Sequence, residues 1–146
     1  MPEHRTVSLL RRAKPGDSLV LGGRNVEVVE PTGTERRILT ESVREQRELG
    51  AIEVEGGKER MILFGRPSSV PVILYKMGIR NLQPLPGARV IVSHSHWEVA
   101  EDVRPSDDDL LYAQQLQEGH PNFSLRCRVV CGRPDKPLAF QYFPLR

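Results

Sequence analysis

Ala88-Arg-Val-Ile-Val-Ser-His-Ser-His96 is the segment that decides most about this chain of 146 residues. Its first half is apolar and β-branched, which is typical of a buried strand. Because side chains alternate along a strand, His94 and His96 should lie on one face, with their Cα atoms about 6.6 Å apart. The segment therefore predicts a central strand that presents two imidazoles at its end.

Downstream of this strand, the sequence predicts a helix that begins with Ser106-Asp-Asp-Asp109. Serine is favoured at a helix N-cap and acidic residues in the first turn, and Gly119 marks the end of the helix. Nine residues separate His96 from Ser106, enough to fold the start of the helix back over the end of the strand. Asp109 should then approach the two imidazoles.

His94, His96 and Asp109 together form a complete ligand set for a catalytic zinc ion. Such ions are typically held by three protein ligands, His and carboxylate among them, and keep a fourth position for water. Each motif alone has an ordinary explanation, since His-x-His pairs arise by chance and Ser-x-x-Asp usually only starts a helix. Their order at the end of a hydrophobic strand favours a mononuclear Zn²⁺ site.

The remaining segments predict a mixture of helices and strands. An amphipathic helix is expected from Thr34 to Glu48, with Gly50 ending it. The other expected elements are hairpins at Ser18–Val29 and Ala51–Phe64, strands at Val70–Tyr75, Ser124–Cys131 and Leu138–Phe143, and a loop at Gly78–Gly87. This order predicts a single α+β (mixed α/β) domain over residues 34–146. Residues 1–33 would form an N-terminal extension that contains the first hairpin.

Composition and charge narrow the class of protein. The chain is 38% hydrophobic and 27% charged, as in ordinary globular proteins, and its net charge is +2. Because basic and acidic residues are interspersed, no nucleic-acid partner is expected. No stretch approaches the roughly 20 apolar residues of a membrane span, and the N-terminus lacks the apolar core of a signal peptide. We expect a cytoplasmic protein, or a domain of a larger polypeptide that is delivered by other means.

The two cysteines, Cys127 and Cys131, fall in one apolar run that is typical of a strand. Four residues of strand span about 13 Å, whereas a disulfide needs Cα atoms within about 7 Å. These cysteines therefore cannot bridge each other, and we expect both to be buried as small hydrophobic side chains.

The motif His94-Ser-His96 followed by Ser106-x-x-Asp109 resembles the signature of the JAMM (MPN+) zinc metalloprotease family, in which an upstream Glu precedes His-x-His and Ser-x-x-Asp. The chain is most similar to the JAB-like domains at the C-termini of bacterial polymorphic (RHS-type) toxins. The resemblance covers residues 34–146 and implies a cytidine-deaminase-like core with a central sheet and flanking helices. The spacer before Ser106 is longer than is common in the family, and Trp97 stands where Pro is frequent. These departures leave the subfamily and the substrate open.

The resemblance also implies the activity and its cofactor, a Zn²⁺-dependent peptidase or isopeptidase. The metal ligands of the family carry over onto His94, His96 and Asp109. Its serine, which helps to hold the scissile carbonyl or the oxyanion, carries over onto Ser106.

The general base of the family is an upstream carboxylate that takes a proton from the attacking water. Glu48 is the first choice for it, because it stands where a helix gives way to the first strand of the core. Glu53 and Glu55, within that strand, are the alternatives.

A protein substrate is implied as the partner, either ubiquitin-like or another cellular target. For a toxin domain, secretion at the C-terminus of a larger effector and an immunity protein are implied as well. Neither nucleic acid nor membrane is expected as a partner.

Other functions stay open at this point, namely an inactive JAMM-like binding module or a toxin of another hydrolase class. A nuclease would use His94 or His96 as a base, but no basic patch supports it. A zinc deaminase would use His96-Trp-Glu98 with the two cysteines, yet it needs Pro-Cys-x-x-Cys opening a helix, and here the spacing is Cys-x-x-x-Cys within a predicted strand.

Overall fold

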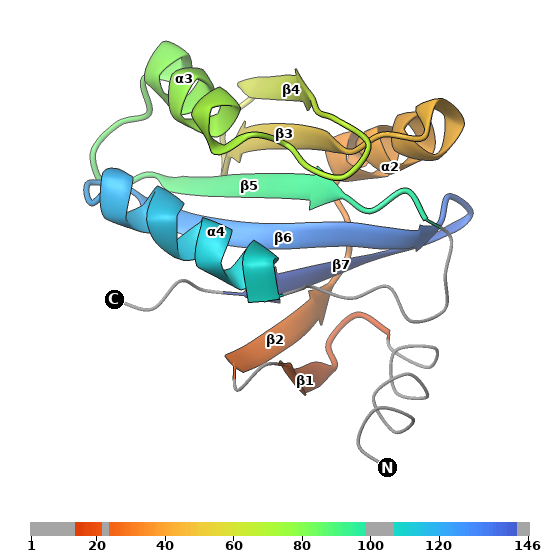
Figure 1. Ribbon diagram of the computed structural model, residues 1–146. Helices are drawn as coiled ribbons and strands as arrows, with labels where there is room; N and C mark the ends of the chain where they lie inside the picture. The colour runs from red at the N-terminus through yellow and green to blue at the C-terminus, as the bar shows by residue number, and fades with distance from the viewer. Residues whose placement is uncertain (1–13, 22–23, 99–106, 143–146) are drawn as a thin grey trace.

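The computed structural model describes residues 14–21, 24–98 and 107–142. The elements within these residues are β1 (Ser18–Leu21), β2 (Arg24–Val29), α2 (Gly33–Glu45), β3 (Leu49–Val54), β4 (Arg60–Phe64), α3 (Val72–Leu82), β5 (Arg89–Ser95), α4 (Asp107–Gly119), β6 (Ser124–Arg133) and β7 (Lys136–Tyr142). All seven strands join one sheet in the order β1-β2-β7-β6-β5-β3-β4 (Figure 1). The predicted mixed α/β class is confirmed.

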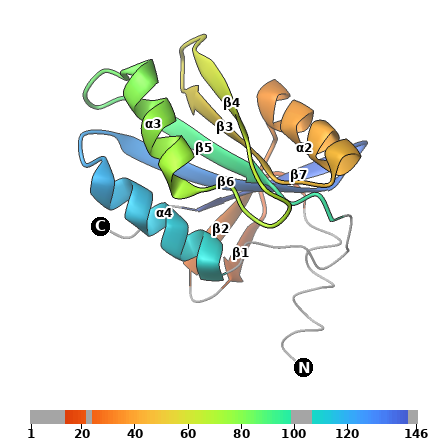
Figure 2. The same ribbon diagram turned by 45° about the horizontal axis from the view of Figure 1, so that its top comes forward.

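The three helices of the described residues cover both faces of the sheet, with α2 on one face and α3 and α4 on the other (Figure 2). The larger hydrophobic core lies under α3 and α4, where Ile79 and Leu116 pack against Val92, Cys127 and Phe140 of the sheet. Smaller apolar clusters lie under α2 and include Ile38, Leu39, Ala51 and Val130. The sheet is therefore covered on both sides, which explains why most residues of the central strands β5 and β6 are buried.

Strand β5 occupies the interior of the sheet, as its sequence predicts. All of its residues after Arg89 are buried. It pairs antiparallel with β3 and parallel with β6, and the β5–β6 pair is the one parallel pair among the described strands. Parallel neighbours need a crossover connection, and α4 lies in this one. The crossover brings α4 back over the face on which Val90, Val92 and His94 lie.

Both predicted hairpins are present. β3 and β4 pair antiparallel, as do β1 and β2, although Gly22 and Gly23 lie outside the described residues. β2 also pairs with β7, so the first hairpin extends the same sheet as the rest of the chain. The division into an extension and a domain at residue 33 stays a prediction.

The predicted strand at Val70–Tyr75 and the predicted loop at Gly78–Gly87 are wrong, because helix α3 runs through both. Tyr75 and Ile79, one helical turn apart, are buried against the sheet. A Cβ atom at Gly78 would collide with Ile52, so the glycine lets the helix lie close to the sheet instead of breaking it.

Helix α2 also ends earlier than expected. Gln46, in the left-handed conformation, ends it, and its N–H bonds to the Ser42 carbonyl oxygen. Gly50 lies instead in β3, where a Cβ would lie 2.5 Å from the Tyr75 hydroxyl oxygen. Glu48 is thereby left in the short connection between α2 and β3.

The cysteines behave as the sequence predicts: Cys127 and Cys131 are free, buried and on one strand. Burial raises the pKa of each thiol from 9.0 to about 12. The thiolate fraction is then about a thousandfold lower than for an ordinary cysteine, and the thiolate is the reactive form.

We expect neither cysteine to react with an aromatic disulfide reagent at pH 8 while the protein is folded, and both to react once it is unfolded in denaturant. The measurement is the release of the coloured thiol over time. Labelling of the native protein within minutes would contradict this prediction.

No helix within the described residues is both long and apolar enough to cross a membrane.

Candidate metal centre

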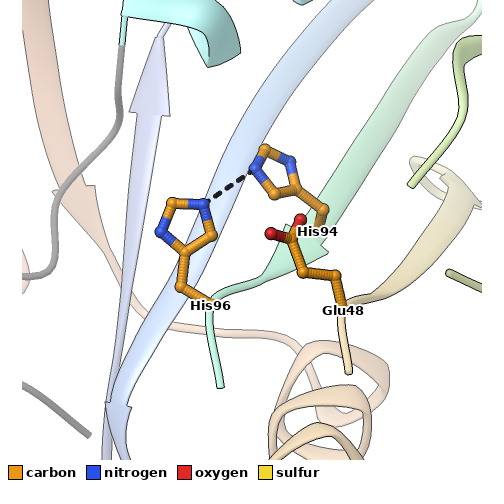
Figure 3. Close-up of side chains that lie close together, drawn as sticks. All are labelled: Glu48, His94 and His96. Carbon is orange, nitrogen blue, oxygen red and sulfur yellow. Dashed lines mark hydrogen bonds between the residues drawn. The ribbon is translucent and has the colours of Figure 1, made fainter. Parts of the chain in front are cut away.

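The two predicted histidines lie together at the end of β5. His94 is the last buried residue of this strand on the α4 side, and only 8% of its surface is exposed. His96 directly follows the strand, and its N–H bonds to the Val130 carbonyl oxygen at 2.9 Å, which continues the pairing with β6. The two Nε2 atoms are 3.2 Å apart (Figure 3). Alternation along the strand therefore produces the convergence that it predicts.

Asp109 reaches both imidazoles from the first turn of α4. Its Oδ1 lies 2.8 Å from His94 Nε2 and its Oδ2 lies 3.4 Å from His96 Nε2. The start of the helix is anchored to the sheet, because the Tyr142 hydroxyl donates to the Asp109 carbonyl oxygen at 3.2 Å. The predicted approach of this helix to the end of β5 is present in the fold.

The donors of this centre lie at separations close to those around a tetrahedral metal ion. Zinc binds His nitrogen and carboxylate oxygen at roughly 2.0–2.2 Å in tetrahedral geometry, which places neighbouring donors about 3.3 Å apart. The two imidazole Nε2 atoms are 3.2 Å apart, while Asp109 Oδ1 lies 2.8 Å from His94 Nε2 and Asp109 Oδ2 lies 3.4 Å from His96 Nε2. Asp109 therefore contacts the two imidazoles through different oxygens, whereas single donor atoms of Glu48, His94 and His96 all lie within 4.8 Å of one another.

Glu48 approaches the same centre from the start of β3, which pairs with β5. One carboxylate oxygen of Glu48 and the nearest nitrogens of His94 and His96 all lie within 4.8 Å of one another. Figure 3 shows the Glu48 side chain reaching up from the start of β3 towards the two rings. Glu48 is thus close enough to act on a molecule bound beside the histidines, or to serve as a ligand itself.

The alternative bases lie elsewhere. Glu53 accepts a hydrogen bond from the Thr32 hydroxyl at 2.8 Å, next to the N-terminus of α2 and on the opposite face of the sheet. Glu55 forms an ion pair with Arg126 at 3.4 Å, beyond the end of β3 that is remote from Glu48. The structure therefore brings Glu48 to the histidines and leaves the other two carboxylates away from them.

The ionisation of the centre follows from its burial and its contacts. Burial alone would lower the pKa of His94, but the hydrogen bond to Asp109 and the negative charges of Asp109 and Glu48 together outweigh it, and the pKa of His94 is raised. Burial alone would raise the pKa of Asp109, yet hydrogen bonds from His94 and His96 hold it well below its usual range. Asp109 is therefore ionised at neutral pH, which is the state in which a carboxylate binds a cation.

The pKa of Glu48 is shifted in the opposite direction to that of Asp109. Burial raises its pKa above the ordinary value, and Asp109 and Glu98 contribute to the increase, while His94 and His96 partly offset it. Two carboxylates beside one site thus have pKa values shifted in opposite directions, a pattern typical of sites that separate a ligand from an acid–base group.

The main chain of Glu48 is held by the turn that follows β4. Its N–H bonds to the Arg66 carbonyl oxygen, and its own carbonyl oxygen accepts from the Gly65 N–H, both at 2.9 Å. A Cβ at Gly65 would lie 2.5 Å from the Glu48 carbonyl oxygen and 2.7 Å from that of Ser69. This close approach requires glycine, and sequence reasoning did not detect the requirement.

Gly65→Ala should therefore destabilise the protein by about 1–3 kcal/mol, as for other overpacked sites, because two backbone atoms would have to move. Gly33→Ala is the matched control: a Cβ at this first residue of α2 meets no atom within 4 Å. Its effect should be neutral or slightly stabilising. The measurement is urea unfolding of both variants, and equal midpoints would refute the close contact.

Ser106, the predicted oxyanion residue, lies outside the described residues, so its role stays a prediction.

A small apolar cavity of about 10 Å³ lies beside His94, lined in part by Tyr75, Leu116 and Tyr142. The Tyr75 hydroxyl donates to the Ser93 carbonyl oxygen at 2.6 Å. His94 thus packs against largely apolar side chains, and the cavity beside it has almost no room for water.

Comparisons of this chain with known protein families, with curated proteins and with solved structures find no match. Any functional assignment therefore depends on the geometry of this centre and on the resemblance of its motif.

Proposed function

We propose that this protein is a zinc-dependent hydrolase of the JAMM type, which cleaves a peptide or isopeptide bond. The observation that carries the proposal is the convergence of His94, His96 and Asp109 at donor spacings close to those of tetrahedral zinc, with Glu48 beside them. Three protein ligands and a neighbouring carboxylate are the parts that a hydrolytic zinc site needs.

In this proposal His94, His96 and Asp109 hold the ion. A zinc ion supplies Lewis acidity and lowers the pKa of water towards about 7. Glu48 accepts a proton from the attacking water and returns it to the leaving amine. The raised pKa of Glu48 suits this role, because a group that both takes and gives a proton works best when its pKa lies close to the working pH.

The proposed substrate is a protein, either ubiquitin-like or another cellular target. If the chain acts as the effector domain of a bacterial toxin, an immunity protein would be its partner. The deaminase alternative has less support, since Cys127 and Cys131 lie within strand β6, whereas a zinc deaminase needs its cysteine pair at the start of a helix.

Metal content tests the proposal. The purified protein should retain about one zinc per chain through dialysis, whereas His96→Ala should retain little, because two of the three ligands form too weak a site. His120→Ala is the control, since this histidine follows α4 and contacts the Leu116 carbonyl oxygen instead of the centre. Zinc is measured by elemental analysis. No zinc in the parent, or equal zinc in the parent and His96→Ala, would refute the assignment.

A further inference from the structure

We infer that Trp97 and Ser95 are positioning residues for Glu48, so that one short segment both presents the two imidazoles and holds the carboxylate opposite them. The inference rests on the proposed function in one respect, namely that Glu48 acts at the centre. The contacts that carry it involve the main chain on both sides of Glu48.

Trp97 contacts the turn that holds Glu48. Its indole N–H donates to the Pro67 carbonyl oxygen at 2.7 Å. Pro67 lies inside the turn closed by Arg66 and Ser69, where the Arg66 N–H bonds to the Ser69 carbonyl oxygen at 2.7 Å. The adjacent Arg66 carbonyl oxygen accepts from the Glu48 N–H. A single hydrogen bond from Trp97 therefore fixes the turn next to the group that binds the Glu48 main chain.

Ser95 holds the chain on the other side of Glu48. Its hydroxyl accepts from the Leu49 N–H at 3.0 Å and donates to the Leu49 carbonyl oxygen at 3.2 Å. The β3–β5 register ends with Gly50 opposite His94, so Leu49 would come next in the pairing. The Ser95 side chain bonds to both backbone groups of Leu49 where the backbone pairing of β3 with β5 stops.

The four consecutive residues 94 to 97 have two kinds of contact. His94 and His96 meet at the centre, while Ser95 and Trp97 contact the chain on either side of Glu48. Because catalytic groups must be held within about 0.5 Å of their working geometry, a shared segment that sets both partners is an effective support.

Amide hydrogen exchange tests the contacts themselves. Trp97→Phe keeps an aromatic ring but removes the donor, and should speed exchange at the Glu48 and Gly65 amides about fivefold, the effect of one net hydrogen bond. Ser95→Ala should do the same at the Leu49 amide, and Ser95→Thr, which keeps the hydroxyl, should restore the parent rate. Amides of the β6–β7 pairs should not change in any variant. Parent rates at Glu48 and Gly65 in Trp97→Phe would overturn the role of Trp97, and parent rates at Leu49 in Ser95→Ala would overturn that of Ser95.

The visible absorption of Co²⁺ added to the metal-free protein tests whether Trp97 acts through Glu48. Trp97→Phe should alter the spectrum of the otherwise unchanged protein and should have no further effect in Glu48→Gln. Equal changes in both backgrounds, or no change in either, would overturn the inference, since a general structural effect does not depend on Glu48. If the parent binds no Co²⁺, the proposed function fails, and hydrogen exchange alone then decides the positioning roles.

Discussion

Asp109→Asn should abolish zinc binding and leave the fold intact. Asparagine has the same shape, and its amide oxygen can still accept a hydrogen bond from His94, so the start of α4 should stay in place. The variant loses the negative charge that Asp109 carries at neutral pH. Removing a direct ligand should weaken the affinity by more than the roughly 10- to 100-fold that loss of an outer-shell partner costs.

The measurements are zinc content after dialysis and the shift of the thermal midpoint on adding a chelator. Bound zinc stabilises the folded state, so chelation should lower the midpoint of the parent but not that of Asp109→Asn. Asp135→Asn is the matched control, because it removes the same charge in the exposed turn between β6 and β7. A full chelator shift in Asp109→Asn would instead assign the ion to Glu48, His94 and His96, which also lie close enough together to hold one.

Glu48→Gln should have the opposite pattern, with zinc retained and hydrolysis lost. Glutamine preserves the size of the side chain but cannot accept a proton from the attacking water. The expected loss of turnover is about 10²–10⁴-fold, as for removal of a general base. The assay is cleavage of a ubiquitin-like fusion or an isopeptide-linked conjugate, with zinc content measured on the same samples.

Glu53→Gln is the control for this prediction, since Glu53 lies in β3, the strand that follows Glu48, but contacts Thr32 on the other face of the sheet. It should keep both zinc and activity. Activity retained in Glu48→Gln and lost in Glu53→Gln would contradict the assignment of the base. Loss of zinc in Glu48→Gln would show that Glu48 is a ligand.

The sequence alone was sufficient where local pattern determines structure. The β-branched run before His94 predicts strand β5, and the period of two places both histidines on one face. The predicted central sheet, its two hairpins and the helix that brings Asp109 are all present in the fold. In these segments the local preference and the tertiary packing agree.

Local pattern failed where a glycine has a packing role. Gly78 and the prolines after it favour a loop, yet α3 continues through Gly78, because the missing side chain lets the helix approach Ile52. Gly50, expected to end a helix, lies in a strand beside Tyr75 for the same reason. A glycine that breaks an element and a glycine that permits close packing look alike in sequence, and only the neighbouring element distinguishes them.

In the candidate centre, too, some features follow from the sequence and others only from the packing of the chain. Spacing along one strand is enough to pair His94 with His96. The choice of Glu48 over Glu53 depends on the face that each presents, which the β3–β5 register sets. Ser95 contacts Leu49, which lies 46 residues away in sequence, and Trp97 contacts Pro67, which lies 30 residues away. Alternation is a property of one strand, whereas register and turn contacts belong to pairs of segments, so they are decided only when the chain packs.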